Sequence, residues 1–351
     1  KRIEALANEN DLNIRKWKIA LEWQEKAEAR VKDSETQAQG WYDKLDKAEA
    51  DLKRLREAVE KYLARFGPGW VEQREENGHT YLRLKTLDEY RTLFEESGKF
   101  LLIKGEEITD KYKKWPVHVN ATNLRDLIPP QGGDSVAETI QNNVNAVLVQ
   151  RQTTGQPMFL HVNHPNFGWA ITAEDLMRVH GERFFEVYNG HPSVHNEGGT
   201  NYVSVDRIWD IVQTWRLAEL ARGPLYGLAT DDAHNYLGDP KKKANPGRGW
   251  VMVRAPYLTP ENLIRAMEAG DFYASNGVCL KDVRRDPTAY TVEVDPEPGV
   301  TYTIQFIGTL SGYNRSKEHA KAEQGDLLPP TLRYGGNIGK VLKEVTDTKA
   351  T

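Results

Sequence analysis

Short apolar runs alternate with helix-length amphipathic stretches between residues 100 and 229. The apolar runs cover residues 100–103, 117–119, 158–162, 184–188 and 225–229. The amphipathic stretches cover residues 136–150, 173–179 and 205–221. Strands that alternate with helices in this way favour a parallel sheet, either open or closed into a barrel. The sequence therefore predicts an α/β fold.

The region after this alternation carries shorter signals. A helix from Pro260 through Met267 leads to an apolar run at residues 272–274. Alternating apolar residues at 290–294 and 302–306 predict an antiparallel hairpin around Pro296 and Gly299. We expect the remaining residues, 311–351, to form a polar tail made mostly of loops.

The first 66 residues differ from the rest because they contain no proline, no histidine and a single glycine, Gly40. This composition favours helix. Turn signals at Asp33, Ser34 and Gly40 predict a helical hairpin. Seven residues at alternating spacings of three and four form a heptad stripe. They are Leu45, Ala48, Leu52, Leu55, Val59, Tyr62 and Phe66. The stripe leaves two alternatives open, a helix that caps the main domain or self-association into a homo-oligomer.

A domain boundary is expected at Gly67-Pro68-Gly69, because a proline between two glycines cannot continue a helix. A polar stretch, residues 72–79, follows it. The sequence thus divides into a helical segment (1–66), an α/β domain that includes the C-terminal hairpin (67–310) and the polar tail (311–351).

Charge and cysteine content exclude several classes of partner. The chain has 47 basic and 51 acidic residues, so no net positive field attracts nucleic acid or an anionic membrane surface. No window approaches 18 consecutive apolar residues, and we expect no membrane span. The single cysteine, Cys279, rules out an intramolecular disulfide framework and a cysteine zinc cluster. The compartment stays open. Because the chain starts at Lys1, we expect a processed or truncated product.

Histidine carries the chemical information, since seven of the nine histidines lie between His118 and His234. The carboxyl ends of parallel strands carry the chemistry in α/β folds, because their loops converge on one pocket. Polar residues stand at the predicted strand ends in four places: Glu106 and Glu107, His118, His161 and His164, and Asp232 and His234.

These residues form a nitrogen and oxygen ligand set suited to a divalent metal such as zinc, manganese or iron. Asp232 and His234 are two residues apart, so an extended segment turns both to one side. His161 and His164 cannot face the same way on one strand, and we favour His164 as the ligand. Alternatively, Glu106 and Glu107 are a solvated strand end, and His118 is an ordinary partly buried histidine.

Other catalytic styles fit poorly. The sequence has no Gly-x-Ser-x-Gly elbow, no phosphate loop and no Gly-x-Gly-x-x-Gly motif after a strand. Metal-assisted hydrolysis is the chemistry that remains. The predicted pocket residues are Asn120, Asn163, Trp169, Tyr188, Asn189 and His191. The His191–His195 loop either lines this pocket or has no direct role.

Several segments resemble the later motifs of the PHP (polymerase and histidinol phosphatase) superfamily, and more narrowly the CehA/McbA metallohydrolase family. The resemblance covers roughly residues 56–310, and the motifs are specific only in combination. They are residues 105–109 (GEEIT), 118–120 (HVN), 164–166 (HPN), 186–192 (EVYNGHP), 230–234 (TDDAH) and 269–277 (AGDFYASNG).

The resemblance implies a distorted seven-stranded (β/α) barrel with two or three divalent metals at its carboxyl end. It implies activity on phosphate or carbamate-type esters. By motif, Glu107 bridges metals, His118 and His164 hold one metal, and Asp232 and His234 belong to the others. The implied catalytic residues are Glu107, His164 and Asp232.

The chain departs from the family at its start. The family's opening His-x-His and Asp-His strands are absent, and a histidine-free helical segment occupies their place. The expected barrel is therefore incomplete at its start. Three explanations stay open: a degenerate natural member, a chimeric chain, or a fragment. Two functions follow, a metal-dependent hydrolase or a catalytically impaired PHP-like binding or assembly protein.

Overall fold

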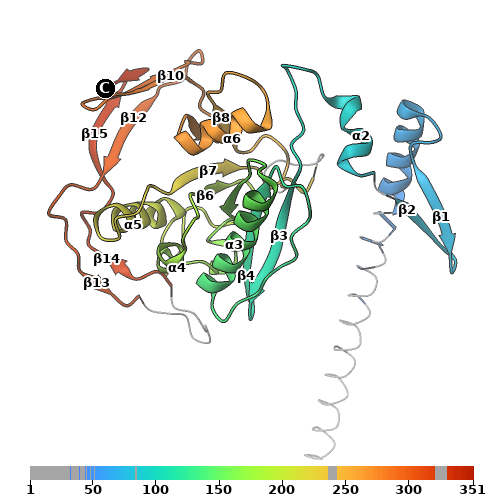
Figure 1. The fold of residues 1–351 in the computed structure, drawn as a ribbon, viewed down its shortest axis with the longest axis horizontal. Coiled ribbons are helices and arrows are strands. Elements are labelled where there is room, and N and C mark those ends of the chain that lie inside the picture. The colour runs from blue at the N-terminus through green and yellow to red at the C-terminus, as the bar shows by residue number, and fades with distance from the viewer. Residues whose placement is uncertain are drawn as a thin grey trace, which may run out of the picture. The chain divides into compact units, whose positions relative to one another are not determined.

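The computed structural model of the chain describes residues 52–83, 85–235, 243–320 and 330–351, with isolated positions between 32 and 50 (Figure 1). The chain divides into two compact units, residues 1–89 and 90–351. The predicted turn at Asp33, Ser34 and Gly40 lies outside the described residues, as do Leu45 and Ala48 of the stripe. None of the described helices is both long and apolar enough to cross a membrane.

The first unit contains a helix and a hairpin. Residues 52–66 are helical, and Gly67, with a φ of 88°, ends the helix by donating its amide to the carbonyl of Leu63. The polar stretch after it forms the hairpin of β1 (Glu72–Glu76) and β2 (His79–Arg83). Asn77 and Gly78 both have positive φ, which is the two-residue turn that best fits the twist of paired strands. The next helix is α2 (Leu87–Phe94).

A five-stranded sheet, ordered β3-β4-β5-β6-β7, organises the second unit. The strands are β3 (Gly105–Tyr112), β4 (Trp115–Thr122), β5 (Phe159–Val162), β6 (Phe184–Asn189) and β7 (Tyr226–Thr230). The first three pair antiparallel, and β5, β6 and β7 pair parallel. The chain is thus a mixed α/β protein, and the expected parallel arrangement holds only for the last three strands. No sheet among the described residues closes into a barrel.

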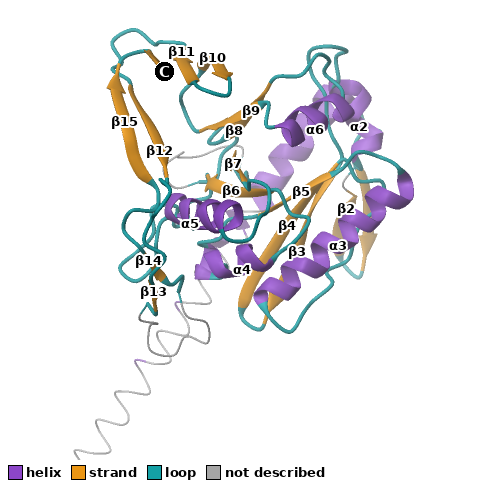
Figure 2. Cartoon of the chain, turned by 60° about the vertical axis from the view of Figure 1, so that its left-hand side comes forward, coloured by secondary structure: helices purple, strands orange, loops and turns teal. Residues whose placement is uncertain are grey.

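Three helices cover one face of this sheet (Figure 2). They are α3 (Val136–Thr154), α4 (Ala173–Arg178) and α5 (Val205–Ala218). The side chains of Ser135, Thr172 and Ser204 cap their first turns by accepting backbone N–H groups. The predicted helices are confirmed, with ends that differ by up to four residues.

Strand β4 shows how the core selects its face. Trp115, Val117, Val119 and Ala121 are buried in the core cluster under the helices, whereas the residues between them are only partly buried. Because strand residues alternate between faces, His118 lies on the face away from the helices. Burial of alternate residues of β4 therefore determines the face of the sheet on which its polar side chains lie.

The predicted strand at residues 100–103 is wrong, and this moves two candidate ligands. The ladder of β3 begins at Gly105, which pairs with Thr122, the last residue of β4. The next residue, Asn123, has a φ of 65° and leaves the sheet, so residues before Gly105 have no strand to pair with. As a result Glu107 and His118 lie inside strands and not at carboxyl ends.

The face opposite the helices is partly covered by a second cluster. Strands β8 (Trp250–Val253) and β9 (Phe272–Ser275) pair antiparallel and flank α6 (Pro260–Ala269). Met267 of α6 packs there against Phe184 and Leu228 of the sheet. The second cluster thus covers part of this face and does not include Glu107, His118 or His164.

The C-terminal region is built from further strands. They are β10 (Leu280–Arg285), β11 (Tyr290–Val294), β12 (Thr303–Gly308), β13 (Lys317–Glu318), β14 (Arg333–Tyr334), β15 (Lys340–Thr346) and β16 (Lys349–Ala350). The predicted hairpin of β11 with β12 is wrong, since β11 pairs with β10 and β16 while β12 pairs with β15. Residues expected in a loop-rich tail thus supply strands, and Ile338 is fully buried in the main core.

A buried carboxyl group precedes β6 on the side of α5. Glu182 is 1% exposed, and its Oε1 accepts the amide N–H of Phe184. Its Oε2 and the Nη1 of buried Arg216 have no hydrogen-bond partner among the described residues. Burial raises the pKa of Glu182 well above its ordinary value of 4.5, against the opposing charge of Arg216.

The raised pKa of Glu182 predicts a pH-dependent stability. Above pH 4.5 the unfolded chain releases this proton while the folded chain keeps it, so stability falls as pH rises toward the folded pKa. The slope from this group is at most about 1.4 kcal/mol per pH unit. We expect Glu182→Gln to flatten the dependence between pH 5 and 8, as measured by urea unfolding. Parallel curves for the two proteins would contradict it.

The helical stripe of the first unit gives a second prediction. Leu52 and Leu55 are 49% and 48% exposed, and Tyr62 is 49% exposed. We expect these side chains to pack against another helix, so Leu52→Asp with Leu55→Asp should reduce helix content or dissociate an oligomer. Circular dichroism and light scattering measure the two effects. If the double variant changes neither, the stripe has no packing role.

Candidate metal centre

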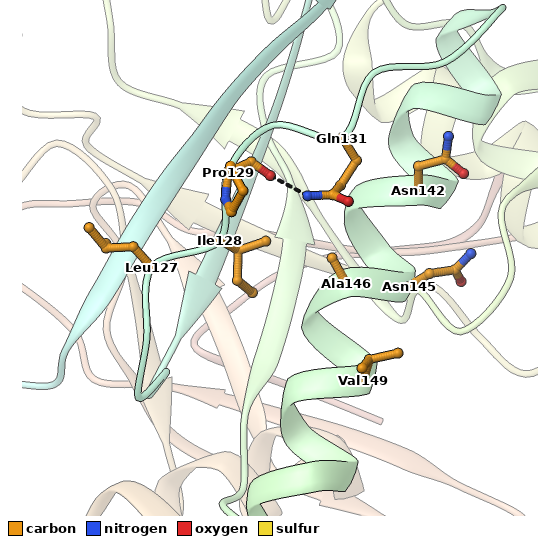
Figure 3. Close-up of a pocket in the computed structure, with 8 residues that line it drawn as sticks. All are labelled: Leu127, Ile128, Pro129, Gln131, Asn142, Asn145, Ala146 and Val149. Atoms are coloured by element: carbon orange, nitrogen blue, oxygen red, sulfur yellow. Dashed lines mark hydrogen bonds between the residues drawn. The ribbon is translucent and has the colours of Figure 1, made fainter.

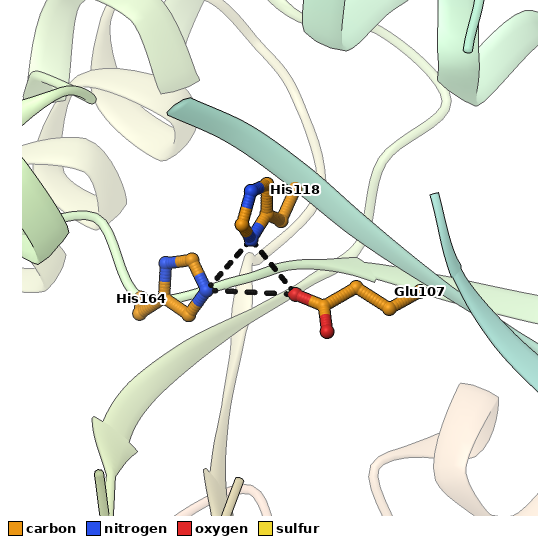
Figure 4. A group of neighbouring side chains, drawn as sticks. All are labelled: Glu107, His118 and His164. Atoms are coloured by element: carbon orange, nitrogen blue, oxygen red, sulfur yellow. Dashed lines mark hydrogen bonds and ion pairs between the residues drawn. The ribbon is translucent and has the colours of Figure 1, made fainter. Parts of the chain in front are cut away.

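Three predicted ligands meet on the face of the sheet away from α3 (Figure 4). The Nδ1 of His118 lies 2.8 Å from Oε1 of Glu107 and 3.2 Å from Nε2 of His164. The third distance, from Nε2 of His164 to Oε1 of Glu107, is 3.6 Å. We call Glu107, His118 and His164 the triad. In the described part of the chain it is the sole group of three such ligands close enough to share one ion.

The spacing of the triad atoms fits a shared metal ion. Two ligands bonded to one ion at about 2.1 Å lie about 3.0–3.4 Å apart, for octahedral to tetrahedral angles. The three observed separations scatter around this range. Two imidazoles and one carboxylate suit zinc, manganese or iron. Three protein ligands also leave coordination positions open.

Strand register explains why these three residues converge. Glu107 pairs with Asn120 and Thr109 pairs with His118, so alternation places Glu107, His118 and Asn120 on one face. His164 reaches them because β5 ends beside the middle of β4, where the amide of Asn163 donates to the carbonyl of His118 at 3.0 Å. The chain then turns sharply at His164, whose φ is 22°.

Two predicted pocket residues border the triad. The side-chain nitrogen Nδ2 of Asn163 donates to Oε1 of Glu107 at 3.0 Å and to Oδ1 of Asn120 at 3.2 Å. The Phe167 ring, in the short helix η1 (Phe167–Trp169), packs against both histidine rings. The triad is therefore braced by an amide on one side and a phenyl ring on the other.

The charges of the triad favour ionised partners. The contacts with His118 and then His164 lower the pKa of Glu107, although burial opposes the shift. Burial alone would lower the pKa of His164, but the contact with Glu107 and the charges of Glu186 and Asp232 raise it overall. The lowered pKa of Glu107 and the raised pKa of His164 favour a carboxylate beside a protonated His164 ring.

Asp232 and His234 form a separate pair after β7. The Nδ1 of His234 lies 2.8 Å from the backbone carbonyl of Asp232 and 3.4 Å from its Oδ1. The rings of His191 and His234 meet edge to face, 5.0 Å apart. Because the Ser193 amide donates to Nδ1 of His191, the neutral ring carries its proton on Nε2. Neither residue of this pair belongs to the group of ligand atoms that all lie within 4.8 Å of one another.

Glu186 connects the two groups, although it was not among the predicted site residues. Its Oε2 accepts the backbone N–H of His164 at 2.7 Å and the Asn189 amide at 2.9 Å. The same Asn189 nitrogen lies 3.2 Å from Oδ2 of Asp232. Burial would raise the pKa of Glu186, but the contact with His161 and the charges of His161 and His164 lower it. Glu186 is therefore a buried carboxylate between the triad and Asp232.

The remaining predicted residues lie at different places. His161 is buried beside Glu186, with its Nε2 3.4 Å from Oε1. Trp169 stacks on His195 and Tyr202 with ring distances of 4.6 and 4.2 Å. Tyr188 pairs with Ala229 in the sheet. Trp169 therefore lies beside the loop that follows β6, and none of these three rings is a member of the triad.

Two surface hollows do not include the triad. One, of about 590 Å³, lies between residues 127–131 and α3 (Figure 3), on the helix side of the sheet. The other, of about 630 Å³, lies between β8, β9 and β10. Neither is lined by a candidate ligand.

Comparisons with known proteins found no significant match, whether to family models, to curated proteins or to solved structures. The geometry of the site thus carries the functional argument.

The triad predicts how metal binding responds to substitution. His118→Ala and His164→Ala should each abolish tight binding, because two remaining ligands hold an ion poorly. His234→Ala should weaken it less, since this residue lies outside the triad. Elemental analysis and titration with zinc or manganese would measure occupancy, which we expect to be at most one ion per chain. Two or more tightly held ions would contradict this prediction.

Proposed function

We propose that the chain is a metal-dependent hydrolase of the PHP type that acts on phosphate or carbamate-type esters of small molecules. The observation that carries the proposal is the triad, with three donor atoms 2.8 to 3.6 Å apart. In this proposal β3 to β7 are the part of a PHP-type barrel that the chain retains. The ion is zinc, manganese or iron, held by Glu107, His118 and His164.

A bound divalent ion would supply acidity, since it lowers the pKa of a coordinated water toward about 7. The protein's own residues prepare the surroundings. The contacts of the Glu107 carboxylate with His118, His164 and Asn163 all use Oε1, which leaves Oε2 to accept a proton. Asn163 holds that carboxylate in place, and the 36% exposure of Glu107 gives a substrate access to it.

Asp232 and His234 complete the proposed site from the other side. The backbone carbonyl of Asp232 accepts a hydrogen bond from Nδ1 of His234, so the lone pair of the neutral ring lies on Nε2. His234 is 61% exposed and is therefore accessible to a substrate. Asn189 and His191 line the same side, which fits a small polar substrate.

Hydrolysis by the purified protein tests the proposal. We expect turnover of an activated phosphodiester or an aryl carbamate that requires added manganese or zinc. His118→Ala should reduce the rate by at least about 100-fold, because loss of a ligand removes the ion. His319→Ala, an exposed histidine outside the site, is the matched control and should be unchanged.

The contrary outcome is metal binding without hydrolysis of either substrate class. It would replace the proposal with the alternative, a PHP-like binding or assembly protein whose triad holds a structural ion.

A further inference from the structure

A single buried carboxylate contacts all three parallel strands of the sheet at their carboxyl ends. Glu186 of β6 is 2% exposed. Its Oε2 accepts the His164 amide, just past β5, and its Oε1 accepts the Thr230 hydroxyl, at the end of β7. His161, within β5, lies beside the same oxygen.

The backbone it holds is unusual. His164 has a φ of 22°, a conformation that L residues adopt only when neighbouring contacts enforce it. Its N–H points at Glu186 Oε2 from 2.7 Å, a short bond to a charged acceptor. This bond fixes the turn that aims the His164 ring at Glu107 and His118.

A β-bulge lets Glu186 share its face with Asn189. Side chains three residues apart on a regular strand point to opposite faces. Here Glu186 pairs with Leu228 while Tyr188 pairs with Ala229, so Val187 is an extra residue. Gly227 makes room for it, because a Cβ at that position would lie 2.9 Å from the Val187 side chain.

The bulge creates a continuous path between the two ligand groups. It runs from the His164 backbone through Glu186 and Asn189 to Asp232, with distances of 2.7, 2.9 and 3.2 Å. We name Glu186 and Asn189 the carboxylate–amide bridge. Both residues are almost completely buried, so water cannot substitute for them.

We propose that Glu186 is a positioning residue, which acts through the carboxylate–amide bridge to set the His164 ligand and the Asp232 pair at a fixed separation. The inference rests on the proposed metal site for its function, but the contacts that carry it do not need a metal. It predicts that losing the bridge loosens the triad even though no ligand is removed.

Four substitutions separate positioning from general stability. Glu186→Ala removes the acceptor of the His164 amide, and metal affinity should fall about 10- to 100-fold, as is usual when a ligand loses its outer support. Glu186→Gln keeps an oxygen for His164 and Asn189 and can turn its NH₂ toward Thr230 and His161. It should therefore recover most of the affinity.

Glu182 provides the matched control, because it is another buried glutamate four residues earlier in the chain with no contact to either ligand group. Glu182→Ala leaves a similar cavity and should lower the melting temperature without changing zinc or manganese affinity by more than about twofold. If Glu186→Ala does not fold, Asn189→Ala cuts the same bridge and should also weaken binding.

A measurement without metal makes the inference independent of the proposed function. The His164 amide should exchange slowly with solvent in the parent and in Glu186→Gln, and at least tenfold faster in Glu186→Ala or Asn189→Ala. If the parent binds no metal but shows this pattern, positioning stands and the proposed hydrolase fails. The inference is overturned if His164 exchanges equally in all variants, or if Glu182→Ala and Glu186→Ala weaken metal binding alike.

Discussion

Burial of alternate residues in β4 is the constraint on which the site depends. Four side chains from Trp115 to Ala121 are buried in the core under the helices, so the strand cannot turn over without exposing all of them. His118 is thereby held on the opposite face at a fixed position along β4. Antiparallel pairing with β3 then places Glu107 beside it. The hydrophobic core and the strand pairing thus fix the positions of Glu107 and His118 independently of their polar contacts.

The position of the third triad member, His164, depends on a hydrogen bond to a buried carboxylate. Glu186 is buried beside His161 and the His164 backbone, and these contacts keep its pKa low despite burial. A neutral side chain of the same shape would hold the turn at His164 less strongly, because bonds to an ionised acceptor are about twice as strong. Apolar packing of β4 therefore positions Glu107 and His118, whereas polar contacts among β5, β6 and β7 position His164.

Local periodicity accounts for what the sequence could predict. Helices α3 to α5 and strands β4 to β7 carry clear patterns, and polar residues next to apolar runs include all three triad members. Long-range pairing was not readable: β12 pairs with β15, and the start of β3 is set by the end of β4. The Asn77-Gly78 pair is a sequence signal for a hairpin, although residues 72–79 were described only as a polar stretch. The role of Glu186 has no such signal in the sequence, because it depends on an irregular strand register.

The β-bulge at Val187 divides β6 into two parts, and the side chains of the two parts alternate out of step with each other. Up to Glu186 its alternation is in phase with Leu228, and beyond Val187 it is shifted by one residue. Deleting Val187 would convert the bulge into a regular ladder, in which Glu186 and Asn189 are two residues apart and still lie on one face. A one-residue deletion before Glu186, in the regular part of the strand, would instead exchange the faces of the residues that it shifts. The effect of a deletion in β6 therefore depends on whether the lost residue lies at the bulge or outside it.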